Sequence, residues 1–263
     1  MSGFHVRVVF LLLVLSVSGS LAAQVPPFQC FAISPIPPLV RPDGLKEKTA
    51  DLILNCMGGT ATPAGAPVPQ VDISVALNTN ITSRLLGSGL NEALLLIDEP
   101  AYVAQRLCEP APCSIPGVNP SSMPGSGPGV NYGAAGVPNV FQGSPKPGTS
   151  NQVAWASVPI DPPGTASYRA IRITNIYTNA MQSVFYHPFA PGVKMITLVV
   201  TMTVNGTPVP VISTAFPGLP DLIVAFTVPG LSLSVSGATP CLNGSRTALL
   251  NFSGFLSEKC NCG

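Results

Sequence analysis

Apolar and polar residues alternate along several stretches of the chain, and this alternation predicts β-strands. Between residues 71 and 78 every odd position is apolar and every even position is small or polar. Residues 196–204 carry a similar pattern, as do the leucines and serines of 231–235. Successive side chains of a strand point to opposite faces, so each stretch predicts a half-buried strand. In the second stretch we expect Leu198, Val200 and Met202 to face a core, with Thr201 and Thr203 facing away.

Two further stretches are apolar at consecutive positions. Residues 222–228 predict a strand that is buried on both faces. Residues 93–97 suggest the same, although their leucines and alanine would also permit a helical turn. Neither stretch is long enough to span a membrane, which takes roughly 20 apolar residues.

Residues 168–177 contain a break in the alternation. Ile171 and Ile173 share one face, but Ile176 falls on the other, which predicts a bulge or a strand end near Asn175. No window of a dozen residues has a clear period of about 3.6 residues, as a helix would. The pattern therefore predicts an all-β protein, an antiparallel β-sandwich of the jelly-roll or immunoglobulin-like kind.

Proline and glycine separate the predicted strands. Asn205-Gly206, with valines on either side, is typical of a tight β-hairpin. Residues 106–150 are rich in Pro, Gly and Ser and lose the alternation, except around Val140 and Phe141. We interpret this segment as a long surface insertion in the sandwich, since the strands on either side resemble parts of one sheet system. An interdomain linker is the alternative.

The first 22 residues have the features of a cleavable signal peptide. Arg7 precedes an apolar run at 8–17, and the small residues Ser20 and Ala22 predict cleavage between Ala22 and Ala23. The apolar run is shorter than a membrane anchor requires. A lipoprotein would need a cysteine directly after the small residues, and the first cysteine is Cys30.

The rest of the chain divides into a β-sandwich domain at 23–236 and a C-terminal tail at 237–263. Charged residues make up 9% of the chain and the net charge is +1. This low charge argues against a nucleic-acid partner, because a surface that binds phosphates must be basic. Hydrophobic residues make up 46%, which is enough to build a folded core.

Seven cysteines follow the signal peptide, and an oxidising compartment would leave most of them paired. Cys108 and Cys113 are the first disulfide candidates because they are close in sequence, and Cys30 with Cys56 is the second. A zinc site at Cys260 and Cys262 lacks a second close pair with a histidine to complete it. We therefore predict no metal and no cofactor.

Seven segments carry a resemblance to a known group of proteins. They are RPDGL (41–45), DLILNCMGG (51–59), LNTNITSR (77–84), EALLLIDEP (92–100), NVFQG (139–143), VPIDPPGT (158–165) and RITN (172–175). In order and spacing they resemble a family of uncharacterised secreted proteins predicted from soil bacteria, particularly acidobacteria. The resemblance covers about Cys30 to Leu231. It implies export and a β-rich fold, and it brings no assigned activity with it. Because members of the family are often longer, the resemblance also implies that the tail at 237–263 is the start of a truncated second module.

Candidate catalytic residues are few. His187 is the single histidine after the signal peptide, and no Gly-x-Ser-x-Gly motif accompanies it, so we interpret it as a loop histidine at a strand end. Asp98 and Glu99 form the only adjacent acidic pair. Neighbours on an extended strand point to opposite faces, and Pro100 follows, so the pair suggests a turn that ends a strand rather than the two carboxylates of a glycosidase.

The remaining charged residues are weak binding candidates. Three arginines have two interpretations. They recognise an acidic partner or a glycan, or they pair with Asp or Glu at strand ends, and we favour the second interpretation. The arginines are Arg84, Arg169 and Arg172. A calcium site would need converging oxygen ligands. The aspartates are spread singly along the chain, so only a calcium site on a loop, completed by backbone carbonyls, remains open. The aspartates are Asp43, Asp72, Asp98, Asp161 and Asp221.

The sequence therefore suggests an exported β-sandwich with a structural or binding, adhesion-like role and no catalysis of its own. Its partner would be a glycan, a matrix or another surface protein, with no nucleic acid and no membrane span after cleavage. The alternative is an exported hydrolase or a carbohydrate-binding accessory protein with a site on loops. A concave pocket with two or more convergent ionisable groups would favour the hydrolase.

Overall fold

A computed structural model describes residues 25–108, 123–127, 129–135, 137–188, 190–213 and 221–228, together with the backbone of 232–240 and 246–253. The predicted signal peptide, its cleavage site, Leu231 and the cysteines at 113, 241, 260 and 262 lie outside these residues. In the part of the chain that is described, no helix has the length and apolar character needed to cross a membrane.

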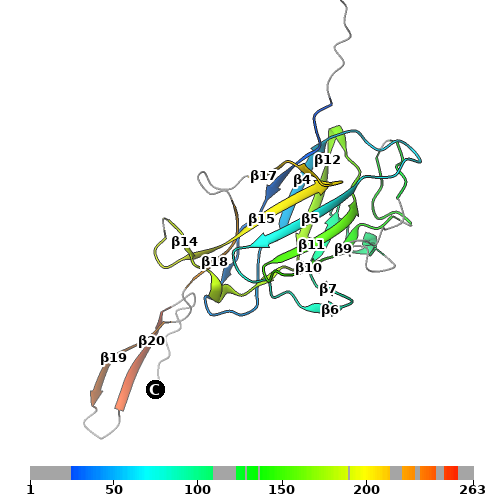
Figure 1. Cartoon of the computed structure of the whole chain (residues 1–263). Coiled ribbons are helices and arrows are strands. Elements are labelled where there is room, and N and C mark those ends of the chain that lie inside the picture. Colours follow the sequence, from blue (N-terminus) through cyan, green and yellow to red (C-terminus); the bar gives the residue numbers. More distant parts are fainter. Residues whose placement is uncertain are drawn as a thin grey trace, which may run out of the picture.

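The described strands form two large sheets (Figure 1). The six-stranded sheet contains, in spatial order, β17 (Val211–Ser213), β1 (Gln29–Ile33), β4 (Leu52–Gly58), β12 (Gly164–Thr174), β8 (Leu94–Ile97) and β9 (Val140–Gln142). The eight-stranded sheet contains β10 (Ser144–Pro145), β11 (Gln152–Pro159), β5 (Gln70–Leu77), β15 (Lys194–Val204), β18 (Leu222–Thr227) and β2 (Leu39–Val40), and β14 (Phe185–Tyr186) and β16 (Thr207–Val209) also pair with β15.

Smaller elements complete the described chain. Three two-stranded sheets join β3 (Glu47–Lys48) to β13 (Tyr177–Thr178), β6 (Leu85–Gly87) to β7 (Leu90–Asn91), and β19 (Ser232–Pro240) to β20 (Arg246–Ser253). Two single 3₁₀ turns, η1 (Tyr102–Ala104) and η2 (Ala180–Gln182), are its helical elements. The prediction of an all-β protein is confirmed, while the strand order does not single out a jelly-roll or an immunoglobulin-like topology.

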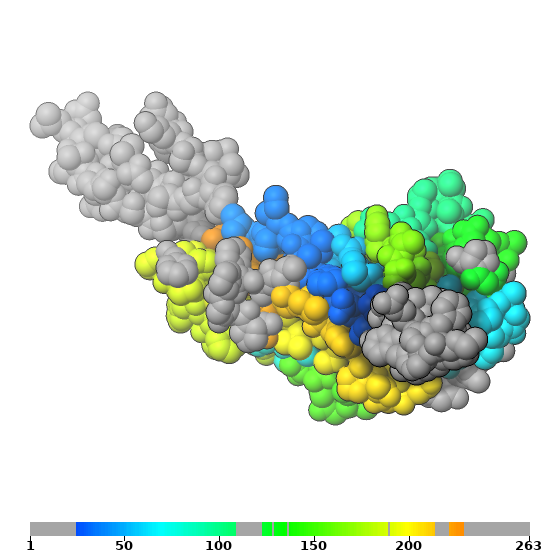
Figure 2. Space-filling model, turned by 90° about the horizontal axis from the view of Figure 1, so that it is seen from above, coloured from blue at the N-terminus to red at the C-terminus, as the bar shows by residue number. Residues whose placement is uncertain are grey.

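Neighbouring strands in the two large sheets are antiparallel, except at two places among the described residues. β1 pairs with β17, and β2 pairs with β18, in parallel. Both pairs join the beginning of the described chain to its later part, so segments far apart in sequence lie side by side (Figure 2, blue beside yellow and orange).

One hydrophobic core lies between the two sheets. The six-stranded sheet contributes Leu52 and Leu54 of β4, and the eight-stranded sheet contributes Ile73 of β5 and the fully buried Trp155 of β11. The predicted alternation in β5 is confirmed, because the apolar odd positions from Val71 to Leu77 are all buried. The sheets are therefore the two layers of a sandwich.

The register predicted for β15 is confirmed in its second half. Leu198 and Met202 are buried, Val200 is partly buried against the core, and Thr201 is exposed. Before Leu198 the pattern changes, because the pairing with β18 shifts between Ile196 and Thr197. At that shift both of these residues are buried.

The strand predictions for residues 222–228, 93–97 and 168–177 are also confirmed, while the burial predicted for residues 231–235 lies outside the described side chains. β18 is buried on both faces over most of its length, and β8 is an extended strand rather than a helical turn. β12 ends at Thr174, and Asn175 follows with a φ of 60°, which reverses the alternation so that Ile176 is buried. Asn205 and Gly206 connect β15 to β16 with φ angles of 49° and 78°, the two positive values of a type I′ turn.

The Pro- and Gly-rich segment is more deeply integrated than its composition predicted. It supplies β9 to an edge of one sheet and β10 to an edge of the other. Phe141 is completely buried, and Gly143 packs so closely on β11 that a Cβ would lie 2.6 Å from Val153. The strands before and after the segment pair with one another, β5 with β11 and β8 with β12.

Cys30 and Cys56 form a disulfide, as the second candidate pair suggested. They are directly opposed on β1 and β4 and are completely buried in the core. Cys108 is also disulfide-bonded, and Cys113, its expected partner, lies outside the described residues. In the tail, β19 runs across the domain boundary expected after residue 236.

A pair of substitutions in β15 tests the register. Leu198→Ala removes a side chain that is 1% exposed and should lower the free energy of unfolding by about 2–5 kcal/mol. Thr201→Ser changes an exposed residue and should cost about 0.5 kcal/mol or less. Urea unfolding of both variants measures the difference, and equal midpoints would show that the register is wrong.

Candidate functional site

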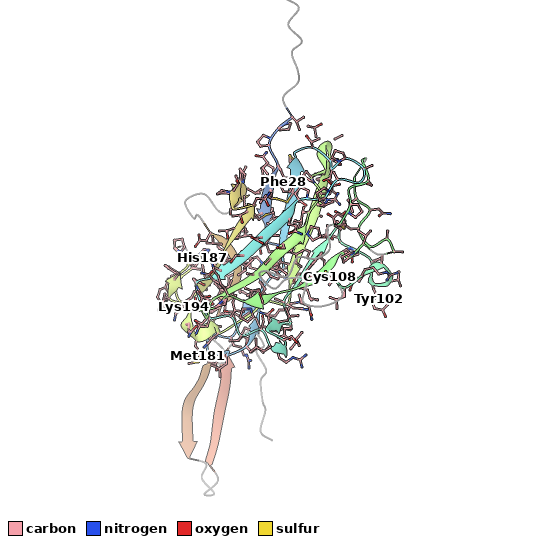
Figure 3. All side chains as sticks on the ribbon, turned by 45° about the vertical axis from the view of Figure 1, so that its right-hand side comes forward. Phe28, Tyr102, Cys108, Met181, His187 and Lys194 are labelled. Carbon is pink, nitrogen blue, oxygen red and sulfur yellow. A yellow bond between two sulfur atoms is a disulfide. The ribbon has the colours of Figure 1, made fainter. Side chains whose placement is uncertain are left out.

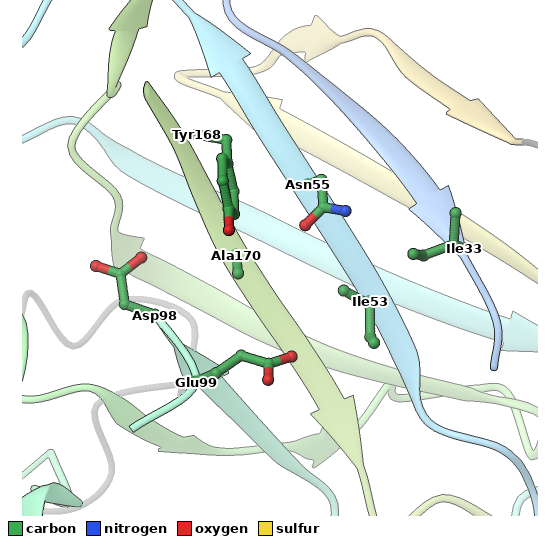
Figure 4. A pocket seen from close by; sticks show the side chains of 7 residues that line it. All are labelled: Ile33, Ile53, Asn55, Asp98, Glu99, Tyr168 and Ala170. Carbon is green, nitrogen blue, oxygen red and sulfur yellow. The ribbon is translucent and has the colours of Figure 1, made fainter. Parts of the chain in front are cut away.

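The outer face of the six-stranded sheet carries an open groove of about 520 Å³. Its lining comes from three neighbouring strands and from the turn after β8 (Figure 4). The residues are Ile33 on β1, Ile53 and Asn55 on β4, Tyr168 and Ala170 on β12, and Asp98 and Glu99 in the turn. Because Ile33 is paired with Ile53, and Asn55 with Ala170, side chains of one sheet face line the groove together.

The groove combines apolar, aromatic and polar surfaces. Ile33, Ile53 and Ala170 are partly buried, while the Tyr168 side chain is largely exposed. Figure 4 shows the Tyr168 ring on β12 beside Asn55 on β4, with its hydroxyl directed toward Ala170. Asp98 and Glu99 lie along the same side of the groove as Tyr168.

Backbone geometry brings the two acidic neighbours to the groove. β8 ends at Ile97, and the φ angles of Asp98 and Glu99 are 61° and 41°, in the left-handed region that non-glycine residues rarely adopt. The backbone amide of Asp98 still donates to the carbonyl of Ala170 at 2.7 Å, so the turn stays attached to β12. The pair is the strand-ending turn that the sequence predicted, and its side chains reach different faces of β12: Asp98 pairs with Arg169 on the buried face and Glu99 with Arg172 on the outer face.

Arginines of β12 hold both carboxylates. Arg172 donates to Glu99 at 2.7 Å and to Asp51 of the loop before β4 at 3.1 Å. The hydrogen bond to Glu99 raises the pKa of Arg172 above its ordinary value. Arg169 forms an ion pair with Asp98. Both arginines therefore pair with acidic residues near strand ends, which was the favoured interpretation of the sequence.

Arg169 is the more deeply buried of the two, at 6% exposed. Its Nε donates to the backbone carbonyl of Asp161 at 3.0 Å, and its guanidinium lies 4.5 Å from the centre of the Tyr132 ring. Burial raises the pKa of Asp98, and the charge of Arg169 offsets part of that increase. The ion pair thus connects the edge of the groove to a polar cluster inside the protein.

That cluster joins three loops through Asp161 and Tyr132. The Asp161 carboxylate is completely buried and accepts the backbone amides of Thr62 and Val130 at 2.8 and 2.9 Å. The Tyr132 hydroxyl accepts the amide of Asp161 and donates to the carbonyl of Pro159. Burial raises the pKa of Tyr132 well above its ordinary value, so this hydroxyl keeps its proton as a donor.

Several polar atoms of the groove have no hydrogen-bond partner among the described residues. They are the side-chain amide of Asn55, the hydroxyl of Tyr168 and Oε2 of Glu99. The Arg172 bond uses the other oxygen of the Glu99 carboxylate, whereas the Asp98 carboxylate accepts from Arg169 and from the backbone amide of Ala170. The groove therefore offers both donors and acceptors to a ligand.

The remaining candidates lie elsewhere. Arg84 is 3.8 Å from Glu92, which also pairs with Lys46 at 2.8 Å. His187 follows β14 as a loop residue, and its ring meets Phe226 edge-on with centroids 5.7 Å apart. Figure 3 shows His187 on the opposite side of the molecule from Tyr102 and Cys108.

The aspartates do not gather into a metal site in the described part of the chain. Asp72 accepts the amide of Ser157, whose positive φ marks an irregularity in the pairing of β11 with β5, and Asp221 accepts from Thr197. Asp43 is exposed. Within the described ranges, no three His, Cys, Asp or Glu side chains are placed to share an ion.

Asn55, Tyr168 and the cluster around Tyr132 were not among the residues that the sequence marked as candidates. Asn55 stands between apolar neighbours in β4, and its position was a usable signal, since it is the polar residue on the face opposite Leu54 and Cys56. Tyr132 lies in the segment without alternation, where no periodic pattern marks a buried residue.

No protein-family model, no curated protein and no solved structure matches the chain. What can be inferred about function therefore comes from the sequence and from the groove.

Tyr132→Phe tests the buried cluster. The change keeps the ring and removes the hydroxyl, which leaves the amide of Asp161 and the carbonyl of Pro159 without their partner. We expect the free energy of unfolding to fall by about 1–3 kcal/mol. Tyr102→Phe is the control, because Tyr102 is 86% exposed and its change should stay within about 0.5 kcal/mol. Urea unfolding measures both, and an unchanged Tyr132→Phe variant would contradict the assigned role.

Proposed function

We propose that this protein is an exported, extracellular or cell-surface β-sandwich with a binding or structural, adhesion-like role, and that the groove is its ligand surface. The observation that carries the proposal is the set of unengaged polar atoms beside the exposed Tyr168 ring. The lining of the groove combines apolar and polar side chains, and its volume lies within the range of about 300–1,000 Å³ that is usual for ligand pockets.

Export is supported by the signal-peptide pattern of the first 22 residues together with disulfide bonding. Disulfides persist in oxidising compartments and are rare in the cytosol. Cys30–Cys56 and the bonded Cys108 fit that environment. The resemblance to secreted proteins of soil bacteria supports the same compartment.

A role in binding rather than catalysis is supported by the ion pairs. A general acid or base has to exchange a proton with the substrate, whereas Asp98 and Glu99 each bind an arginine of β12. Such pairs fix the orientation of the carboxylates, which favours recognition of a ligand. No cofactor is needed for this role.

One observation favours the hydrolase alternative. Burial raises the pKa of Asp98, and Glu99 lies in the same groove. Glycosidases use two carboxyl groups in this way, one with a raised pKa as the acid and the other ionised. The groove does hold two ionisable groups, so the alternative has to be tested with the same protein.

Binding and hydrolysis are separated in one experiment on the mature protein, residues 23–263. We expect it to bind at least one immobilised glycan, matrix or surface-protein preparation, with no turnover on ester, peptide and glycoside substrates. Tyr168→Ala should weaken that binding about tenfold or more, because an aromatic anchor typically dominates a binding site. Tyr102→Ala, at an exposed tyrosine outside the groove, is the matched control.

Asp98→Asn, Glu99→Gln and His187→Ala complete the design, with the fold of each checked by circular dichroism. A wild-type hydrolytic rate that falls by about 10²-fold or more in a folded variant would replace the binding proposal with the hydrolase. Binding that Tyr168→Ala leaves intact would move the ligand surface away from the groove.

A further inference from the structure

We propose that the ligand of the groove is a neutral carbohydrate, bound as a segment of an oligo- or polysaccharide chain. The inference rests on the proposed function and narrows it to one chemical class. It follows from three properties of the lining: the types of unengaged polar atoms, the balance of charge, and the position of the groove on the face of the sheet.

The unengaged atoms select a ligand that is rich in hydroxyl groups. Oε2 of Glu99 can only accept hydrogen bonds when the carboxylate is ionised, while the Asn55 amide and the Tyr168 hydroxyl can both donate and accept. A sugar hydroxyl also does both, so neighbouring hydroxyls of one ring can satisfy all of these atoms. Hydrogen bonds to ionised acceptors are the stronger kind.

The apolar lining suits the other part of a sugar. A pyranose ring has faces made of C–H groups, and these pack against aromatic rings and small apolar side chains. Tyr168 offers such a ring at 68% exposure, and Ile33, Ile53 and Ala170 lie beside it. Tyrosine is well suited to this contact because it has an apolar body and a polar end.

The charges of the groove disfavour strongly charged ligands. Asp51, Asp98 and Glu99 carry three negative charges and Arg169 and Arg172 carry two positive ones, so the net charge of the cluster is −1. A polyanion would meet carboxylates that line the groove. A polycation would have to compete with arginines that already bind them at 2.7–3.1 Å in the case of Arg172.

The position of the groove disfavours an extended peptide. Peptides that add to a sheet use the free backbone groups of an edge strand. The groove lies over β4 and β12, each of which is paired on both sides within the sheet. Their backbone groups are engaged over most of β4 and from Ile171 of β12 onward, so recognition there depends on side chains, while residues 165–168 of β12 lie in a register shift.

Arg169 and Arg172 act as positioning residues in this account. Arg172 holds the Glu99 carboxylate on the outer face of the sheet, while Arg169, on the buried face of β12, anchors the turn through Asp98. A site that is ordered before binding loses less entropy when its ligand arrives. The ligand therefore meets a rigid arrangement of acceptors.

Titration calorimetry on the mature protein tests the inference. The neutral probes are hexasaccharides of β-1,4- and α-1,4-linked glucose, β-1,4-linked xylose and β-1,4-linked N-acetylglucosamine. A galacturonate hexamer and hexalysine are the charged probes. We expect at least one neutral hexasaccharide to have a Kd at least tenfold lower than that of either charged probe. A tenfold change in Kd corresponds to a binding free energy of about 1.4 kcal/mol.

Three groove variants and one control locate the binding. Tyr168→Ala removes the stacking surface and Asn55→Leu removes a donor and an acceptor at similar size, so each should weaken the neutral sugar about tenfold. Tyr168→Phe keeps the ring and should lose less than Tyr168→Ala. Tyr102→Ala should leave Kd unchanged.

The outcomes separate the inference from the proposed function. In one outcome, hexalysine or a protein ligand binds, no neutral sugar binds, and Tyr168→Ala abolishes the binding. This result would overturn the carbohydrate class and keep the groove as a binding surface. Sugar binding that survives both Tyr168→Ala and Asn55→Leu would overturn the assignment to the groove. If no probe and no glycan, matrix or surface-protein preparation binds, both the inference and the proposed function fail.

Discussion

Pairing of the buried guanidinium of Arg169 is the interaction on which both the groove and the long insertion depend. A charge at 6% exposure is tolerated only when it is paired and hydrogen-bonded, because removing an ion from water costs several kcal/mol. The partners of Arg169 are the Asp98 carboxylate, the Asp161 carbonyl and the Tyr132 ring. Each comes from a different part of the chain, so pairing this one charge fixes three segments relative to β12.

The consequences run inward and outward from that charge. On the inner side, Asp161 and Tyr132 hold the backbone at Thr62 and Val130, which lets a segment poor in apolar residues dock on the sandwich through hydrogen bonds. On the outer side, the ion pair favours the left-handed turn at Asp98 and brings Asp98 and Glu99 to the groove. The proposed binding surface is thus built on the stable part of the fold.

The sequence predicted those features that have a local pattern. The alternation in β5 and in the second half of β15 identified the buried residues because a half-buried strand requires it. Asn205-Gly206 identified its turn because few residues tolerate two positive φ angles. The pairing of Arg169 and Arg172 with acidic residues was also expected, since a chain with 9% charged residues has little reason to bury a charge alone.

Features that depend on contacts between distant segments could not be predicted in this way. Tyr132 and Asp161 meet across 29 residues and Arg172 meets Asp51 across 121, and nothing in either neighbourhood indicates its partner. The groove was not predicted, because Ile53 and Asn55 share one face of β4. The isoleucine on that face hides the alternation of apolar and polar residues that would have marked the face as exposed.

Native-state hydrogen exchange of the Val130 amide tests most directly whether the buried cluster holds the insertion to the sandwich. This amide donates to the completely buried Asp161 carboxylate, so it should exchange only through openings whose free energy approaches that of global unfolding. The amides of Thr62 and Asp161 should be protected to the same degree. Exchange of Val130 at the rate of an exposed loop, while the β5 amides remain protected, would contradict the account.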